Sequence, residues 1–222
     1  MSRSVPIAAS AIGAALLIVW LLPAPAQQFS ADLVRMDAGG AGSRPAGKLN
    51  VSDGRVRIET SDLLEGYFLV LGDAGATYFL RPAAKVFMDA KQSSLLTQLL
   101  VAVNPDDPCR QWQAAAVIAG AAAPGAQWRC ERGGDDTVSG LRTIKYRATS
   151  PQGRQHFGWI DPQLRFPVRL QMDDGAVVDV ANIAAAPQPE RLFAVPAAYR
   201  KFDPQQLIDR IRHSDVLVEP RQ

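Results

Sequence analysis

The sequence predicts a mainly β protein, an antiparallel sheet with a few short helices. Polar and apolar residues alternate with a period of two along most of the chain after residue 26. Such alternation is typical of strands that have one face in water and the other on a core. Turn-forming residues separate these runs at short intervals, and helical periodicity is confined to a few stretches.

The first 26 residues have the features of a secretory signal peptide. Arg3 supplies a positive start, residues 5–22 carry no charge, and small residues at positions 24 and 26 precede a cleavage site before Gln27. This order predicts export and removal of the segment. An uncleaved membrane anchor is the alternative, because the apolar stretch approaches the ~20 residues that span a bilayer. We expect residues 27–222 to form one soluble domain in the periplasm.

Strands are expected wherever the alternation is clear. In residues 55–59, for example, Val56 and Ile58 share one face and charged side chains occupy the other. Two runs, 67–71 and 77–80, are apolar on both faces, which predicts mid-sheet strands that are covered on both sides. The expected strands are residues 28–36, 47–52, 55–60, 66–72, 76–80, 85–89, 126–132, 138–149, 154–160, 165–173, 176–184 and 191–195.

Three segments have helical character and are expected to cover the apolar face of the sheet. Residues 92–103 carry an apolar stripe that includes Leu95 and Leu99. Residues 109–119 form a weaker, alanine-rich candidate. The third helix is expected to begin at Asp203, with a proline in its first turn.

Cys109 and Cys130 are the two cysteines of the chain. An exported protein meets an oxidising compartment, so we predict that they form a structural disulfide holding a helical insert at about 92–130 against the sheet. The bond would close a loop of about 22 residues and contribute roughly 3 kcal/mol. A redox or metal role is the alternative, but the pair has neither CxxC spacing nor a nearby histidine.

The charged residues favour no enzymatic or nucleic-acid function. The formal net charge is +2, and the basic residues are dispersed rather than clustered. His156 is expected to be an ordinary surface or edge residue of a strand, and His213 with Asp209 would supply too few metal ligands. No GxSxG motif is present, and Gly133-Gly134 is expected to be a loop without a phosphate-binding motif. Adjacent carboxylates fall in predicted turns at 106–107, 135–136 and 173–174. We expect no catalytic residue, no metal and no cofactor.

Five phrases along the chain occur in the order typical of one family of periplasmic proteins. They are residues 47–49 with 54–59, residues 76–82 with 85–88, residues 140–146, residues 159–161 with 166–169, and residues 192–201. Together they resemble the LolA-like superfamily, the outer-membrane lipoprotein carriers and their relatives, and especially its uncharacterised single-domain branches. The disulfide-bearing insert and the terminal helix depart from the pattern of the carriers.

The resemblance implies a curved antiparallel sheet, an incomplete (half) β-barrel over an apolar hollow with short helices as a lid. Relatives use that hollow to hold acyl chains, lipids or lipoprotein anchors, or to sense such ligands. The expected function is therefore the binding or carriage of a lipid-like ligand or an acylated protein, with transient membrane contact and an envelope partner both compatible. The alternative is a sensing or protein-interaction module without a ligand cavity.

The candidate lining residues are apolar or aromatic residues of the predicted inner face and of the first helix. Whether they line a hollow or fill a core stays open at this point. They are Val56, Ile58, Phe79, Leu95, Leu99, Ile144, Tyr146, Trp159, Leu170 and Met172.

Overall fold

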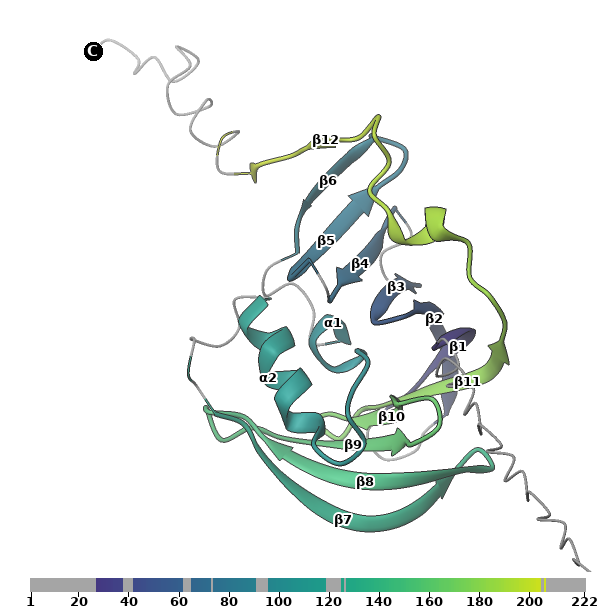
Figure 1. The fold of residues 1–222 in the computed structure, drawn as a ribbon, viewed down its shortest axis with the longest axis vertical. Coiled ribbons are helices and arrows are strands. Elements are labelled where there is room, and N and C mark those ends of the chain that lie inside the picture. The colour runs from purple at the N-terminus through teal and green to yellow at the C-terminus, as the bar shows by residue number, and fades with distance from the viewer. Residues whose placement is uncertain are drawn as a thin grey trace, which may run out of the picture.

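The computed structural model describes residues 27–37, 42–61, 65–72, 74–90, 96–118, 125, 127–204 and 206. Within these residues, twelve strands form one curved sheet that does not close into a barrel. A helical insert lies on its concave side (Figure 1). The predicted fold class is thus confirmed.

The elements follow one another as a run of strands, the helical insert, more strands and a C-terminal segment. They are β1 (Gln28–Met36), β2 (Ser43–Ser52), β3 (Arg55–Thr60), β4 (Tyr67–Leu71), β5 (Ala76–Arg81), β6 (Val86–Asp89), α1 (Leu96–Leu99), α2 (Pro108–Ile118), β7 (Arg129–Val138), β8 (Leu141–Thr149), β9 (Gln155–Asp161), β10 (Phe166–Gln171), β11 (Val177–Ala185), the 3-10 helix η1 (Glu190–Phe193) and β12 (Arg200–Lys201).

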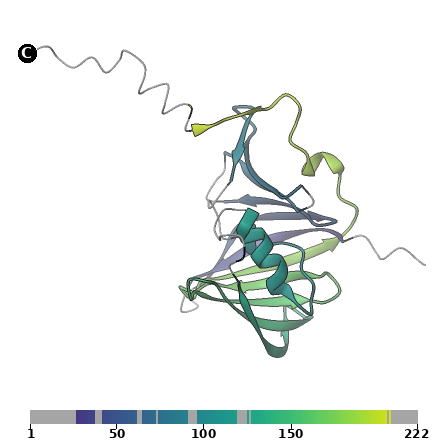
Figure 2. The same cartoon turned by 60° about the vertical axis from the view of Figure 1, so that its left-hand side comes forward.

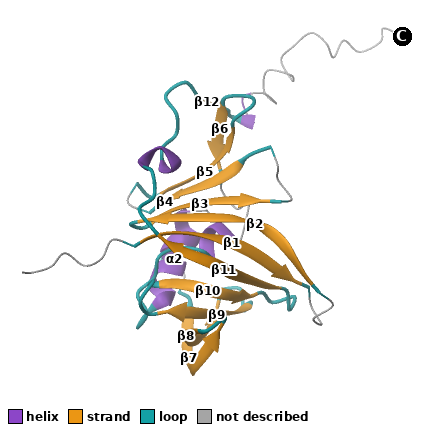
Figure 3. Cartoon of the chain, turned by 90° about the vertical axis from the view of Figure 1, so that its right-hand side faces the viewer, coloured by secondary structure: helices purple, strands orange, loops and turns teal. Residues whose placement is uncertain are grey.

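The strand order in the sheet is β12-β6-β5-β4-β3-β2-β1-β11-β10-β9-β8-β7. The strands are antiparallel to their neighbours, except that β12 runs parallel to β6. Strand β1 lies between β2 and β11 and joins the two halves of the sheet, as Figure 3 shows. Leu33 of β1, for example, lies opposite Gly47 on one side and Val180 on the other.

Tight turns set the register of two of the hairpins. Asp53-Gly54 connects β2 to β3, and Ser139-Gly140 connects β7 to β8. All four residues have positive φ angles, between 47° and 82°. Two-residue turns with positive φ at both positions match the right-handed twist of the strands they join. Each sequence supplies a glycine at the second position, where positive φ costs little.

The main core lies on the concave face and continues into the insert. Phe29 of β1 packs edge-on against Phe166 of β10, with ring centroids 5.4 Å apart. Leu49, Ile58 and Leu170 are buried to 1% exposure or less in the same apolar cluster. Alternation along the strands therefore divides inner from outer side chains as the sequence predicts.

A second, smaller apolar cluster lies on the outer face of β4 and β5. It consists of Tyr67, Leu69 and Leu80, covered by Phe193 of η1. The sequence predicts that both faces of these strands are buried, and this is confirmed. The residues that bury the outer face come from the C-terminal segment and not from a helix of the insert (Figure 1). The predicted strand at 191–195 is wrong, because this stretch forms η1 between Pro189 and Pro196.

Two further predictions are corrected. The helix expected over 92–103 is described only as α1, and Val103 instead donates its backbone N–H to the carbonyl of Arg165 at 2.9 Å. Residues 133–136, expected in a loop and a turn, belong to β7, where a bulge between Arg132 and Gly134 interrupts the alternation. The helix expected after Asp203 lies largely outside the described residues.

Candidate ligand site

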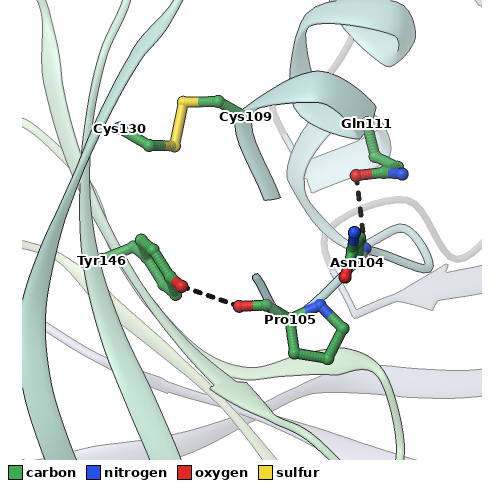
Figure 4. Close-up of a disulfide and its surroundings, with 6 residues drawn as sticks. All are labelled: Asn104, Pro105, Cys109, Gln111, Cys130 and Tyr146. Atoms are coloured by element: carbon green, nitrogen blue, oxygen red, sulfur yellow. Dashed lines mark hydrogen bonds between the residues drawn. A yellow bond between two sulfur atoms is a disulfide. The ribbon is translucent and has the colours of Figure 1, made fainter. Parts of the chain in front are cut away.

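The insert that carries α1 and α2 lies over the concave side of the sheet (Figures 1 and 2) and is bonded to it at several points. The predicted disulfide is present and joins Cys109 at the start of α2 to Cys130 of β7. The hydroxyl of Tyr146 donates to the carbonyl oxygen of Pro105 at 2.7 Å (Figure 4). The covalent bond and the hydrogen bond approach the insert from neighbouring strands, β7 and β8, so they fix both its position and its orientation.

The insert is also bonded within itself. The indole N–H of Trp112 in α2 donates to the carbonyl of Leu99 in α1 at 3.0 Å, in a buried position. At the turn between the helices, the backbone N–H of Asn104 donates to the side-chain oxygen of Gln111 at 3.2 Å (Figure 4). These bonds make α1 and α2 one compact unit on the concave face.

Most of the predicted lining residues lie together in the apolar cluster of the concave side. Leu95 is outside the described residues. The residues that lie in the cluster or pack against it are Val56, Ile58, Phe79, Leu99, Ile144, Tyr146, Trp159, Leu170 and Met172. Val56, Ile58, Leu99 and Leu170 are exposed by no more than 1%, so at these positions the side chains fill a packed core.

Trp159 also belongs to this cluster, but its ring does not point to the inner face. Its neighbour Gly158 faces Trp112 of the insert, so alternation places the Trp159 ring on the outer face of the sheet. There its indole N–H donates to Asp136 at 2.7 Å, and the Lys145 ammonium lies 4.7 Å from its ring centroid. The assignment of Trp159 to the cavity lining is therefore corrected.

The outer face around Trp159 carries an ordered polar cluster that sequence reasoning missed. Arg169 makes a bidentate ion pair with Asp179, with two N–O distances of 2.6 Å. The hydrogen bond to Asp179 raises the pKa of Arg169, and the Trp159 N–H lowers the pKa of Asp136. The sequence signal for this cluster is the charged residues at outer positions of β8, β10 and β11. They become neighbours only through the register of the strands.

An open groove runs along α2. Its volume is about 740 Å³. Ala114, Val117 and Ile118 of α2 line one side, and Trp128 lines the other. The remaining lining residues are Asp107, Cys109, Arg110, Gln113, Gly125 and Gln127. The arrangement offers an apolar strip with a polar rim, which suits a narrow apolar molecule.

His156 lies close to this groove and is buried, which corrects the expectation that it is a surface or edge residue. It is 3% exposed, and its ring lies 5.9 Å from that of Trp128, tilted by 30°. Burial lowers the pKa of its imidazole. The alternation of β9 sends residues 156, 158 and 160 towards the concave side.

Neither a metal centre nor a membrane span stands out in the described part of the chain. No group of three or more His, Cys, Asp or Glu side chains within it is placed to hold a metal ion. No helix among the same residues has the length and hydropathy to cross a membrane.

No protein-family model matches this chain, and no curated protein matches it significantly. Solved structures with a similar course of the chain include PNGF-II (TM-score 0.48, 8% identity, covering 84% of this chain and 33% of that one). A second is the LolA superfamily protein NE2245 from Nitrosomonas europaea (TM-score 0.35, 11% identity, covering 77% of this chain and 91% of that one). A third is MucB in complex with MucA(peri) (TM-score 0.38, 14% identity, covering 77% of this chain and 55% of that one). The chain thus spans about a third of PNGF-II.

Proposed function

We propose that this chain is an exported binding protein that holds a lipid-like ligand in the groove between α2 and the segment leading into β7. One observation carries the proposal: an apolar strip formed by Ala114, Val117, Ile118 and Trp128 lies open to the surface along α2. A ligand placed there would extend the core of the protein without displacing the insert.

The chemistry of the groove suits a hydrocarbon chain. Each methylene that leaves water for an apolar surface contributes about 0.8 kcal/mol. Binding of this kind requires no nucleophile, metal or cofactor. The function would therefore be carriage or sequestration of an acyl chain, lipid or acylated protein in the cell envelope.

The disulfide supports both the location and the mechanism. Disulfides persist in oxidising compartments, in keeping with a periplasmic protein. Cys109 itself lines the groove, so its bond to Cys130 holds the first turn of α2 at a fixed place on the sheet. A groove wall that is fixed before binding reduces the ordering cost of taking up a ligand.

A matched pair of variants tests the proposal. Val117→Asp places a charge in the groove, whereas Val177→Asp makes the same change at an equally half-buried position on the outer face. We expect Val117→Asp to abolish the binding of a fluorescent fatty acid and Val177→Asp to retain it, provided that both variants stay folded. Native mass spectrometry of protein purified from its own host should also detect a retained lipid mass. Failure of the wild type to bind any apolar probe would overturn the proposal.

A second candidate is a protein-binding module, favoured by the edge of the sheet at β7. This strand has ten residues, nearly all exposed, and among the described strands it pairs only with β8. An extended segment of a partner could add to it as a further strand. The test is photocrosslinking in the host from Glu131 on β7, with Glu59 in mid-sheet as the control. A crosslink to one defined protein from the first position alone would favour this candidate over the lipid carrier.

A further inference from the structure

Two neighbouring aromatic rings each carry one buried polar atom that has no hydrogen-bond partner among the described residues. These atoms are Nε1 of Trp128 and Nδ1 of His156. Trp128 is 9% exposed and His156 is 3% exposed, and their rings lie 5.9 Å apart. The indole nitrogen is only a donor, while a neutral imidazole nitrogen can donate or accept, depending on the tautomer.

Such a pair requires a physical explanation. Leaving one buried polar group unsatisfied costs about 1–3 kcal/mol, and in native proteins roughly 90% or more of such groups have a partner. Two neighbouring side chains that can both donate are satisfied together by one small acceptor, such as a carbonyl oxygen placed between them.

The position of the pair connects it with the groove. Trp128 lines the groove opposite Val117 and Ile118 of α2. His156 is paired with Ala148 across β9 and β8, and Ala148 is paired in turn with Cys130, which holds α2. The Trp128 ring therefore borders the apolar strip, and His156 lies next to that ring, two strands away from the disulfide.

We propose that Trp128 and His156 form a polar seat for the carbonyl oxygen of an acyl ester or amide whose hydrocarbon chain lies along α2. This inference rests on the proposed function and adds the chemical class of the head group. The indole N–H donates to the carbonyl oxygen, and His156 donates from Nδ1 to the same atom.

The electrostatics of the seat favour an uncharged head over a carboxylate. Burial lowers the pKa of His156, so its imidazole is neutral at pH 7. Two charged groups act on this ring in opposite senses: Asp173 raises its pKa and Arg154 lowers it, and both are exposed. A buried carboxylate without a close cation pays a large desolvation cost, which a carbonyl group avoids.

The experiment compares three ligands with the same chain, namely methyl laurate, laurate and dodecane, by displacement of a fluorescent apolar probe. The wild type should prefer methyl laurate to both others. Trp128→Phe keeps an aromatic ring but removes the N–H group, so it should weaken binding of the ester about five-fold, the worth of one hydrogen bond. Binding of dodecane should not change. His156→Phe is the second variant and should have the same effect.

Tyr67→Phe is the matched control, because it also removes a polar group from a buried aromatic ring but lies in the outer cluster, on the other face of the sheet from the groove. The ester preference should survive it. If the wild type binds methyl laurate and dodecane equally and the seat variants change neither, the two atoms hold only buried water and the seat is wrong, while the groove stands. A preference for laurate overturns the uncharged head. If none of the three ligands binds, the proposed function itself fails.

Discussion

Gly158 of β9 lies directly against the indole of Trp112 in α2: a Cβ atom at position 158 would come within 2.7 Å of that ring. This contact is one of the points at which the insert meets the sheet. It requires a residue without a side chain in the middle of a strand, where glycine is otherwise unfavourable. A substitution at position 158 therefore tests how closely α2 packs against the sheet.

The substitution Gly158→Ala should destabilise the protein by about 1–3 kcal/mol, because the added methyl group overpacks a closed contact. Chemical denaturation measures the effect. Gly133→Ala in β7 is the control, since a Cβ there would meet its nearest neighbour at an ordinary 3.5 Å, and it should change stability by less than about 0.5 kcal/mol. Equal effects of the two substitutions would contradict the close packing of Trp112.

Loss of the disulfide should loosen the insert more than the sheet. Cys130→Ser is expected to lower the free energy of unfolding by about 2–4 kcal/mol. Hydrogen exchange should show faster opening of α2 than of β2 and β3, which the bond does not touch. Two titratable thiols in the native wild type, or unchanged protection of α2 in the variant, would count against this role.

Stability should fall as the pH drops below about 6.5. Burial holds the pKa of His156 below its ordinary value of 6.5 in the folded protein. Between the two pKa values the unfolded chain binds a proton that the folded chain does not, so folding is disfavoured as the pH decreases through this window. Above pH 6.5 the histidine is neutral in both states, so stability is at its full value. Stability is lost as the pH falls from 6.5 towards the pKa of His156 in the folded protein.

Urea denaturation between about pH 8 and about pH 5 measures this slope, above the range in which ordinary carboxylates titrate. His156→Phe should remove most of it, whereas His213→Ala, the matching change at the other histidine of the chain, should leave it. A slope that persists in His156→Phe would show that another group is responsible.

The outer cluster should contribute to stability without contributing to the groove. Phe193 is 3% exposed and packs with Tyr67, Leu69 and Leu80. Phe193→Ala is expected to cost about 3–5 kcal/mol, as for other large core truncations. Binding of an apolar probe by the remaining folded protein should be unchanged, because the cluster lies on the other face of the sheet from α2. Loss of binding in the folded variant would mean that the two faces are coupled.

Most of the sheet could be predicted from the sequence because each strand carries its own signal. The alternation of Val56 and Ile58 with charged residues fixes their face without reference to any partner. The disulfide was also predictable, since the chain offers two cysteines and no other pairing. Local patterns of this kind are reliable because the apolar residues of each pattern are the ones that become buried.

The errors arise where distant segments meet. Alternation alone does not say which of two faces is the inner one for Trp159, a buried aromatic residue flanked by Gly158 and Ile160. The burial of His156 depends on the insert and on Trp128, far away in the sequence. The bulge at Gly133-Gly134 breaks the period of two, so the sequence pattern there predicts a loop although the residues belong to a strand. Tertiary contacts decide all three cases, and no local pattern records them.

The central seam between β1 and β11 has a consequence for the order in which the chain folds. The side chain of Asn182 in β11 donates to Asp32 in β1 across 150 residues of sequence. The hairpins on either side of the seam form between neighbours, but the two halves cannot join until the chain as far as residue 185 is available. Pairing between segments so far apart is slow, because the loop between them must first lose its entropy. This topology therefore delays the closing step until the second half of the sheet has been synthesised.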